Sequence, residues 1–372
     1  MTQESTFEIF LTAAPGLEQA LLAEAKKLGF AAPKAVPGGV TVQGGWPEVW
    51  RANLSVRGAA RVLARIGEFR AFHLAQLDKR ARKFPWGDVL RSDVPVKVEV
   101  ATNKKSKIYH AGAAAQRVEK AISETLGAPV AKDAEVTVKL RIEDNLCVFS
   151  VDTSGEGLHK RGHKSAVGKA PMRENLAAMF LRECGYTGDE PVVDPMCGSG
   201  TFVIEAAEIA KGLMPGRSRS FAFEKLATFD VGAWSALKQQ GEASETDLFF
   251  HGSDRNEGAV EMAAANAGRA SVADCTRFLQ AAVSDLQRPD GPPGLVIVNP
   301  PYGARIGNKK LLFALYGALG QVLKERFSGW RVGIVTSETG LAKATNLPFL
   351  PFGAPVAHGG LKIRLFKTDP LP

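Results

Sequence analysis

The residues best suited to chemistry stand at the end of an apolar run, where Leu295 to Val298 is followed by Asn299, Pro300, Pro301 and Tyr302. Prolines cannot continue the hydrogen-bond ladder of a strand, so this run predicts a strand that stops in a rigid turn. The Asn299 amide oxygen and the Pro300 carbonyl could accept hydrogen bonds from an amine conjugated to a ring, and Tyr302 could stack on that ring. The alternative is a turn without a chemical role.

A glycine-containing segment upstream could bind a ligand through its backbone. The run Val192 to Phe202 predicts a buried strand, a turn with Gly198 and Gly200, and the start of a helix. Glycine allows close approach of a ligand and a positive φ. The third glycine of the dinucleotide fingerprint is replaced by Val203, and Asp194 at the strand end suits an ammonium better than a pyrophosphate. The segment therefore favours a cofactor that carries an amino acid over NAD.

Two further acidic residues follow predicted strands. Asp254 ends the second strand of this half of the chain, where a carboxylate could bind both hydroxyls of a ribose. Asp285 follows the third strand and could bind an adenine amino group. Each of them could instead cap a helix. Their order at successive strand ends favours a shared role in holding one nucleoside-containing cofactor.

Strand and helix signals alternate from Val192 onward, which predicts a mostly parallel sheet with helices on both faces. The run Leu361 to Phe366 should complete this sheet. His358, just before it, either lines the ligand pocket or belongs to a plain hairpin turn.

The first half of the chain predicts two α+β units. Phe7 to Thr12 reads as a strand and Leu17 to Leu28 as a helix. The second unit has strand signals at Val94 to Ala101, Ala134 to Ile142 and Leu146 to Val151, and helix signals at Leu74 to Lys83 and Ala111 to Leu126. Between them lies a basic loop that could meet a phosphate backbone and a base, or could be a solvated turn; its candidate residues are Lys104, Lys105, Lys107 and Tyr109.

Charge follows the same division. The whole net charge of +8 falls in residues 1–169, which hold 26 Lys and Arg against 18 Asp and Glu. A polyanionic partner would explain this surplus, although a merely solvated surface would look the same. A glycine-containing linker ends this half with four further basic candidates, His159, Lys160, Arg161 and Lys164.

Composition limits the class of protein. A chain of 372 residues that is 45% hydrophobic predicts two or three domains. No stretch approaches the ~20 apolar residues of a membrane span, and the first ten residues do not resemble a signal peptide. Four scattered cysteines and six histidines predict neither disulfides nor a zinc site. We expect a cytoplasmic protein without a metal.

Together the motifs resemble the class I methyltransferase fold, and Asn299-Pro300-Pro301-Tyr302 is similar to the signature of enzymes that methylate exocyclic amines of adenine or guanine. Residues 61–153 resemble a THUMP RNA-binding domain, preceded by a ferredoxin-like domain at residues 1–60. A basic linker at 154–169 and an α/β domain at 170–372, with a Rossmann-like, mostly parallel seven-stranded sheet, complete the resemblance. The matching family is that of THUMP-containing guanine-N2 methyltransferases of the RlmL type.

The resemblance implies methyl transfer from S-adenosylmethionine to the N2 amine of a guanine in RNA. Large-subunit (23S) ribosomal RNA is favoured over tRNA, and a monomer is expected. A DNA adenine-N6 methyltransferase and a non-catalytic RNA-binding factor are the alternatives. Some relatives continue into a second methyltransferase domain, whose activity we do not expect in a chain that ends at Pro372.

The resemblance also assigns roles to residues. The catalytic set is Asn299, Pro300, Pro301 and Tyr302. The cofactor-binding set is Asp194, Met196, Cys197, Gly198, Gly200, Thr201, Asp254, Asp285, Asn299, Pro171 and Asn175. The RNA-binding set is Lys104, Lys105, Lys107, Tyr109, His159, Lys160, Arg161 and Lys164.

Overall fold

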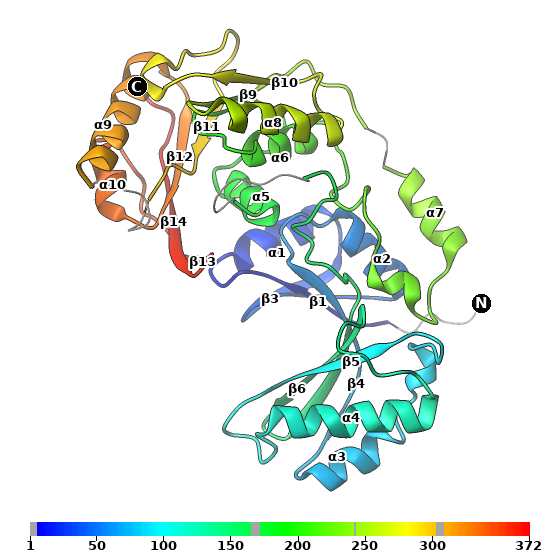
Figure 1. Ribbon diagram of the computed structural model, residues 1–372. Helices are drawn as coiled ribbons and strands as arrows, with labels where there is room; N and C mark the ends of the chain where they lie inside the picture. Colours follow the sequence, from blue (N-terminus) through cyan, green and yellow to red (C-terminus); the bar gives the residue numbers. More distant parts are fainter. Residues whose placement is uncertain (1–5, 165–171, 242, 303–308) are drawn as a thin grey trace. The chain divides into compact units, whose positions relative to one another are not determined.

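The computed structural model describes residues 6–164, 172–241, 243–302 and 309–372. The chain divides into two compact units, each with its own seven-stranded sheet (Figure 1). Unit 1 comprises Met1–Ala13, Leu22–Leu158 and Arg219–Gln240, and unit 2 comprises Ala14–Leu21, His159–Ser218 and Gly241–Pro372. The chain therefore passes between the units several times.

The sheet of unit 2 has the strand order β10-β9-β8-β11-β12-β14-β13. Its strands are β8 (Val192–Asp194), β9 (Phe250–Asp254), β10 (Thr276–Gln280), β11 (Leu295–Val298), β12 (Arg331–Thr336), β13 (Val356–His358) and β14 (Leu361–Lys367). Neighbours from β10 to β12 pair in parallel, whereas β14 is antiparallel to both β12 and β13. This arrangement confirms the predicted seven-stranded, mostly parallel sheet.

Helices cover both faces of this sheet because its central strands are apolar on both sides. They are α5 (Glu174–Glu183), α6 (Thr201–Ala210), α8 (Glu257–Arg269), α9 (Lys309–Arg326) and α10 (Thr339–Ala344), with a short 3-10 helix at Val283–Asp285. Val296 and Val298 of β11 belong to the core cluster formed with α9 and α10. On β12, Gly333 faces the opposite way, where an added Cβ would lie 2.7 Å from the Cys184 sulfur at the end of α5.

The sheet of unit 1 has the order β2-β3-β1-β4-β7-β6-β5. Its strands are β1 (Phe7–Thr12), β2 (Ala31–Val36), β3 (Gly39–Gly44), β4 (Arg61–Arg70), β5 (Val96–Thr102), β6 (Val136–Glu143) and β7 (Leu146–Asp152). All pairs are antiparallel except β5 with β6. Strand β4 pairs with β1 on one side and β7 on the other, so one sheet runs through the boundary expected between residues 60 and 61.

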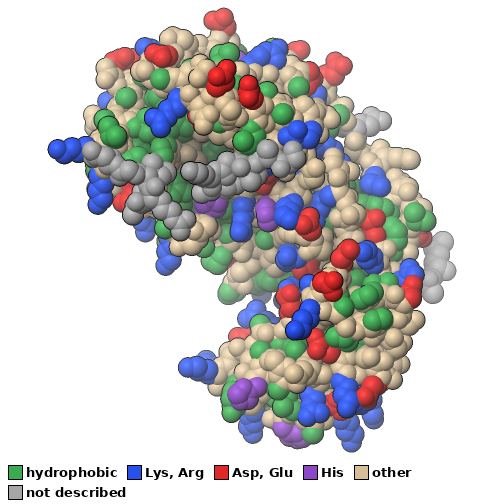
Figure 2. Space-filling model, in the orientation of Figure 1, with side chains coloured by type: hydrophobic (Ala, Val, Ile, Leu, Met, Phe, Trp, Pro, Cys, Tyr) green, Lys and Arg blue, Asp and Glu red, His purple; other side chains and the backbone are tan. Residues whose placement is uncertain are grey.

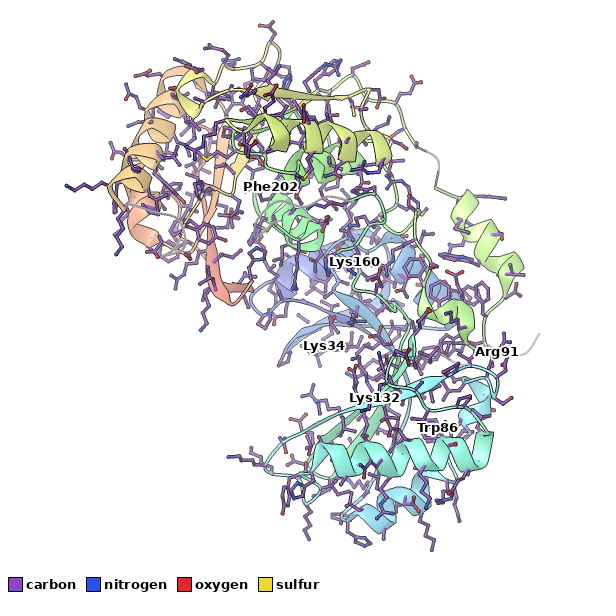
Figure 3. The ribbon with its side chains drawn as sticks, in the orientation of Figure 1. Lys34, Trp86, Arg91, Lys132, Lys160 and Phe202 are labelled. Atoms are coloured by element: carbon purple, nitrogen blue, oxygen red, sulfur yellow. The ribbon has the colours of Figure 1, made fainter. Side chains whose placement is uncertain are left out.

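Aromatic side chains fill the core of unit 1. The helices of the N-terminal part are α1 (Glu18–Lys27), α2 (Trp46–Ser55), α3 (Leu74–Ala81) and α4 (Ala111–Leu126), and Arg219–Gln240 adds α7 (Val231–Gln239). Trp86, labelled in Figure 3, is 2% exposed and packs edge-on against Phe149 of β7. Phe223 from the returning segment lies 6.2 Å from Trp50 of α2, measured between ring centroids. This later segment thus completes a core begun by the first sixty residues.

Candidate functional site

The polar candidates of unit 2 gather at one edge of its sheet. Strands β8, β9, β10 and β11 are parallel, so their carboxyl ends lie at the same edge. Asp194 ends β8, Asp254 ends β9, and Asn299 directly follows β11. Asp285 closes the 3-10 helix after β10 and is exposed. This edge is where ligands bind in open α/β sheets.

The turn after β8 has the backbone conformation that its glycines suggested. Gly198 has φ +51° and Gly200 has φ +84°, values that L residues rarely adopt. A Cβ at Gly200 would also lie 3.1 Å from the Ala263 side chain of α8. Gly200 is the N-cap of α6, and the Asp254 carboxylate accepts a hydrogen bond from the Gly198 N–H at 3.1 Å. This hydrogen bond links the loop between β8 and α6 directly to the end of β9.

Asp194 is a carboxyl group without a basic partner among the described residues. It is 3% exposed, and its Oδ1 accepts a hydrogen bond from the Met196 N–H at 3.1 Å. Burial raises the pKa of Asp194 to about 8, and the negative charge of Asp254 contributes in the same direction. An ammonium group placed beside it would favour the charged carboxylate and lower its pKa. The site thus fits the amino-acid end of a cofactor.

The segment after β11, residues 299–302, contains a hydrogen-bond acceptor that lacks a donor. Within the described part of the chain, the buried Oδ1 of Asn299 has no hydrogen-bond partner. Buried polar atoms are seldom left unpaired, and those that are often belong to functional sites. Tyr302 is half-buried and packs against the core cluster of α9, and its burial raises the pKa of its hydroxyl. An unpaired acceptor three residues before a half-buried aromatic side chain has the chemistry to bind an amine on a flat ring.

Tyr316 supports this turn and was not found by sequence reasoning. Its side chain is fully buried on α9, and its hydroxyl lies 3.2 Å from the Thr336 hydroxyl and 3.4 Å from the Pro301 carbonyl oxygen. Burial raises the pKa of Tyr316 far above its usual range. The apolar spacing of α9 gave no sign of this role, because the two residues in contact lie fifteen positions apart in the chain.

Two more unpaired polar atoms belong to candidate residues. Among the described residues, neither the Asn175 Oδ1 nor the His358 Nδ1 has a hydrogen-bond partner, although both atoms are buried. Asn175 lies in the first turn of α5. His358 ends β13, opposite Leu361 in a hairpin turned by two glycines at positive φ, and burial lowers the pKa of its imidazole with a further contribution from Arg173. The hairpin alternative is therefore correct for the backbone, while the side chain retains an unpaired nitrogen.

The remaining cofactor candidates have varied surroundings. Met196 is partly buried against the core cluster, and Cys197 is 6% exposed. The Thr201 hydroxyl accepts a hydrogen bond from the Lys164 Nζ at 2.8 Å. Pro171 lies outside the described residues.

Two of the basic linker residues differ from expectation. The Arg161 side chain is 1% exposed and pairs with Glu205 at 3.1 Å. The Lys164 side chain is 9% exposed and pairs with Glu174 at 3.2 Å. Both side chains form ion pairs inside unit 2 and have little exposed surface, which disfavours direct contacts with RNA; their assignment to the RNA-binding set stays a prediction. Lys160 is exposed and His159 is partly exposed.

The basic loop of unit 1 is exposed and internally ordered. Lys104, Lys105, Lys107 and Tyr109 are all exposed, and Tyr109 packs on His110 with ring centroids 4.3 Å apart. The Asn103 side chain accepts hydrogen bonds from two backbone N–H groups of the loop, and the Asn145 side chain accepts one from Lys107. Figure 2 shows Lys, Arg and His side chains on this part of unit 1, at the bottom of the view.

Phe72 extends this surface and was missed by the sequence analysis. It is 42% exposed, and the Lys107 Nζ lies 5.6 Å from its ring centroid. The two residues are 35 positions apart in the chain, so no local pattern connects them. An exposed aromatic beside a lysine can stack on a base and neutralise a phosphate at once.

Comparison with known proteins agrees with the geometry. The fold is that of a class I methyltransferase. Residues 161–348 match the family described as "RMKL-like, methyltransferase domain", and residues 8–63 match the "RlmL ferredoxin-like domain". The chain belongs to this RlmL-like methyltransferase family, and its cofactor is S-adenosylmethionine.

Relatives match the chain over nearly its whole length. A protein of Synechocystis sp. named "Putative RNA methyltransferase slr0064" is 30% identical over 98% of this chain and 97% of its own. The structure of SMU.472, described as a methyltransferase complexed with SAH, has 27% identity, full coverage of both chains and a TM-score of 0.88. A structure described as "a predicted N6-adenine-specific DNA methylase from Listeria monocytogenes" has 29% identity, covers 99% of this chain and 97% of its own, and also has a TM-score of 0.88.

No three His, Cys, Asp or Glu side chains of the described ranges cluster in a way that could hold a metal ion. Among the helices described, none is both long and apolar enough to cross a bilayer.

Proposed function

We propose that this protein methylates the N2 amine of a guanine in RNA, with large-subunit ribosomal RNA as the substrate. The observation that carries the proposal is the buried, unpaired Oδ1 of Asn299 at the carboxyl end of β11, directly before a Pro-Pro-Tyr turn. The Synechocystis relative described as an RNA methyltransferase supports RNA, as does the positive charge of residues 1–169. Guanine and the ribosomal substrate rest on the resemblance of the Asn-Pro-Pro-Tyr motif and its flanking domains.

The chemistry follows from the acceptors in the turn. The amine of guanine is a weak nucleophile because its lone pair is delocalised into the ring. Hydrogen bonds from the amine to the Asn299 Oδ1 and the Pro300 carbonyl would localise the lone pair, and Tyr302 would stack on the extruded base. S-Adenosylmethionine supplies the methyl group as an electrophile. The protein contributes orientation of the amine in line with that group, and no covalent intermediate is needed.

The cofactor would be held by the carboxyl edge of the sheet. In this proposal, Asp194 binds the ammonium group, Asp254 binds the ribose hydroxyls, and Asp285 binds the adenine amine. The buried state of Asp194 supports the first assignment, because a cation would relieve the cost of its charge. The positive φ values of Gly198 and Gly200 support close approach of the backbone. Asn175 offers a further unpaired acceptor on α5.

Unit 1 would bind the RNA. We keep residues 61–153 as a module of the THUMP type, with Lys104, Lys105, Lys107 and Tyr109 as contacts and Phe72 added to them. Their exposure and the ordered backbone of the loop support this role. His159 and Lys160 remain proposed contacts from the linker.

Methylation of adenine N6 in DNA is a second candidate. The specific observation in its favour is the Listeria structure described as "a predicted N6-adenine-specific DNA methylase", which is 29% identical to this chain. The same turn could serve either amine, because both are conjugated to a purine ring. The surplus of basic residues suits both polyanions.

A single assay distinguishes these candidates. The protein and labelled S-adenosylmethionine are incubated with ribosomal RNA, tRNA and DNA from cells that lack the enzyme, followed by mass spectrometry of nucleosides. We expect N2-methylguanosine in large-subunit RNA, and an Asn299→Ala variant should lower turnover by about 10²-fold or more. Label in tRNA alone or in DNA adenine would move the assignment to that substrate. An Asn299→Ala variant within about twofold of wild type would contradict the role of the turn.

A further inference from the structure

Helix α6, which begins at the cofactor loop, has an unusual polar stripe. Thr201, Glu205 and Glu208 lie at i, i+4 and i+7 and therefore share one face. Glu205 is 1% exposed and Glu208 is fully buried. Carboxylates at such positions need partners, because an unpaired buried charge is strongly unfavourable.

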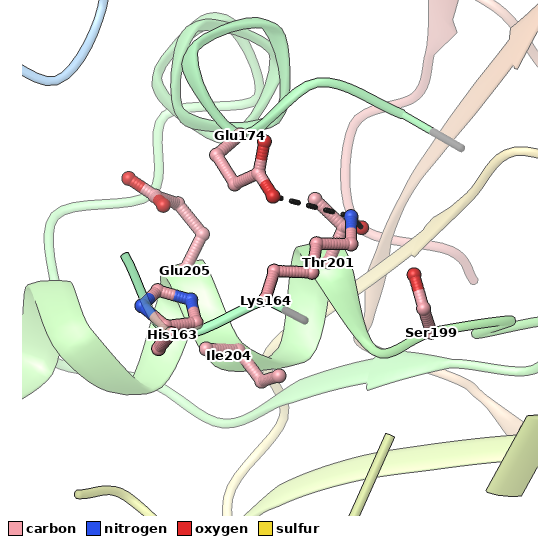
Figure 4. A pocket seen from close by; sticks show the side chains of 7 residues that line it. All are labelled: His163, Lys164, Glu174, Ser199, Thr201, Ile204 and Glu205. Carbon is pink, nitrogen blue, oxygen red and sulfur yellow. Dashed lines mark hydrogen bonds and ion pairs between the residues drawn. The ribbon is translucent and has the colours of Figure 1, made fainter. Parts of the chain in front are cut away.

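The partners come from the end of the linker. Arg161 pairs with Glu205, Lys164 donates to the Thr201 hydroxyl at 2.8 Å, and the His163 Nδ1 lies 3.7 Å from Glu208. Arg217 forms an ion pair with Glu208 at 2.7 Å, whereas burial lowers the pKa of the His163 imidazole and so favours its neutral form. Residues 161–164 thus lie along the polar stripe of α6, with Lys164 at the end nearest the cofactor loop (Figure 4).

Lys164 joins two helices of unit 2. Besides Thr201, its Nζ pairs with Glu174, the first residue of α5, and donates to the Met172 carbonyl at 3.5 Å. Glu174 precedes Asn175, whose Oδ1 is buried and unpaired among the described residues. A cavity of about 10 Å³, room for one water, lies beside Lys164, Glu174 and Thr201. The amine therefore links the start of α5 to the start of α6.

A second line of hydrogen bonds reaches the same loop. The His163 carbonyl accepts from Arg269 at 2.7 Å, and Arg269 also donates to the Asn266 side chain. Asn266, which is fully buried, donates in turn to the Ser199 carbonyl at 3.1 Å. Ser199 lies between the two glycines of the loop. The linker end is therefore connected to the loop from both sides.

We infer that Lys164 is a positioning residue for S-adenosylmethionine: it fixes the first turn of α6, and with it the loop that approaches the cofactor. Its buried, shared amine gives it this role rather than that of an RNA contact. The inference depends on the cofactor and on neither the base nor the nucleic acid proposed above.

The test compares Lys164→Met with Lys211→Met. Lys211 is the C-cap of the same helix; its side chain is 14% exposed and pairs with Asp274 at 2.8 Å. Lys211→Met therefore removes a similar ion pair at the opposite end of α6 from the cofactor loop. Binding of S-adenosylhomocysteine is measured by calorimetry, and amide exchange of residues 197–203 is measured in the ligand-free protein. We expect Lys164→Met to weaken binding by about tenfold and to speed exchange in the loop. Lys211→Met should leave both within about twofold of wild type.

Equal weakening in both variants would overturn the inference, since it would show a general loss of stability. Unchanged binding in Lys164→Met would overturn it too, and weaker RNA binding alone would return Lys164 to the RNA contacts. Should Lys164→Met fail to fold, Glu174→Gln and Lys164→Arg replace it. Glu174→Gln should weaken cofactor binding and Lys164→Arg should retain most of it, whereas wild-type affinity in Glu174→Gln would contradict the inference.

Discussion

At the scale of single residues, Asp194 combines burial with a position at the cofactor edge. Its raised pKa means that the ligand-free protein holds it largely protonated at neutral pH. The ordinary value is 3.8 and the folded value about 8, so the unfolded chain loses this proton first as the pH rises. The group therefore stabilises the ligand-free fold most below pH 4, and that contribution is lost as the pH rises to about 8.

Cofactor binding should consequently release a proton. An ammonium group beside Asp194 favours its charged form, so its pKa should fall on binding. We expect release of about one proton at pH 7. Calorimetry in buffers with different ionisation enthalpies measures it directly. Asp194→Asn should bind more weakly and without this release, and an unchanged proton count in that variant would assign the proton to another group.

At the scale of elements, the packing of α9 on α10 depends on Gly320 having no side chain. A Cβ at Gly320 would lie 1.9 Å from the Thr345 carbonyl oxygen, so any side chain forces the two segments apart. We expect Gly320→Ala to destabilise the protein by about 2 kcal/mol or more. Gly317→Ala is the control on the same helix: its Cβ would meet its nearest atom at an ordinary 3.9 Å, and alanine favours a helix. Chemical denaturation compares them; similar stability of the two variants would contradict this account.

Elements with a regular apolar pattern were predictable from the sequence, and irregular ones were not. The limits of β1 and α4 agree with the structure, because both have clear periodicity. Strand β4 was missed, since its pairing with β7 shifts register between Arg65 and Gly67. Helix α7 was missed because Trp234 is its one buried residue among those described, which leaves no apolar stripe.

The candidate site divides in a similar way. Residues at strand ends, such as Asp194 and Asn299, could be found because strand position alone places them at the carboxyl edge. The burial of Lys164 could not be predicted, because the sequence of a glycine-containing linker does not show whether a basic residue in it pairs with an acidic side chain elsewhere in the fold. Tyr316 and Phe72 join the site surfaces only through contacts distant in sequence.

At the scale of the whole molecule, the uneven charge predicts how RNA binding responds to salt. Each phosphate neutralised by a lysine releases counterions, so affinity should fall steeply as salt rises. Replacing Lys104, Lys105 and Lys107 by alanine in the full chain should reduce the slope of log K against log salt by up to about three. The control removes equal charge from exposed positions elsewhere, Lys27, Lys34 and Lys132, two of which are labelled in Figure 3. Equal slopes of log K against log salt in both triple variants would show that the positive charge contributes to RNA binding regardless of its position.

The path of the chain between the units bears on how the protein is made. Trp50 packs against Phe223 and Phe229, which belong to the segment that returns to unit 1. During translation, the ribosome must therefore finish α5, β8 and α6 before it releases the residues that cover Trp50. Unit 1, which contains the first residues to be synthesised, therefore cannot complete its core until α5, β8 and α6 of unit 2 have been synthesised. The nascent chain must keep this aromatic surface from aggregating in the meantime, a task for which cells use chaperones.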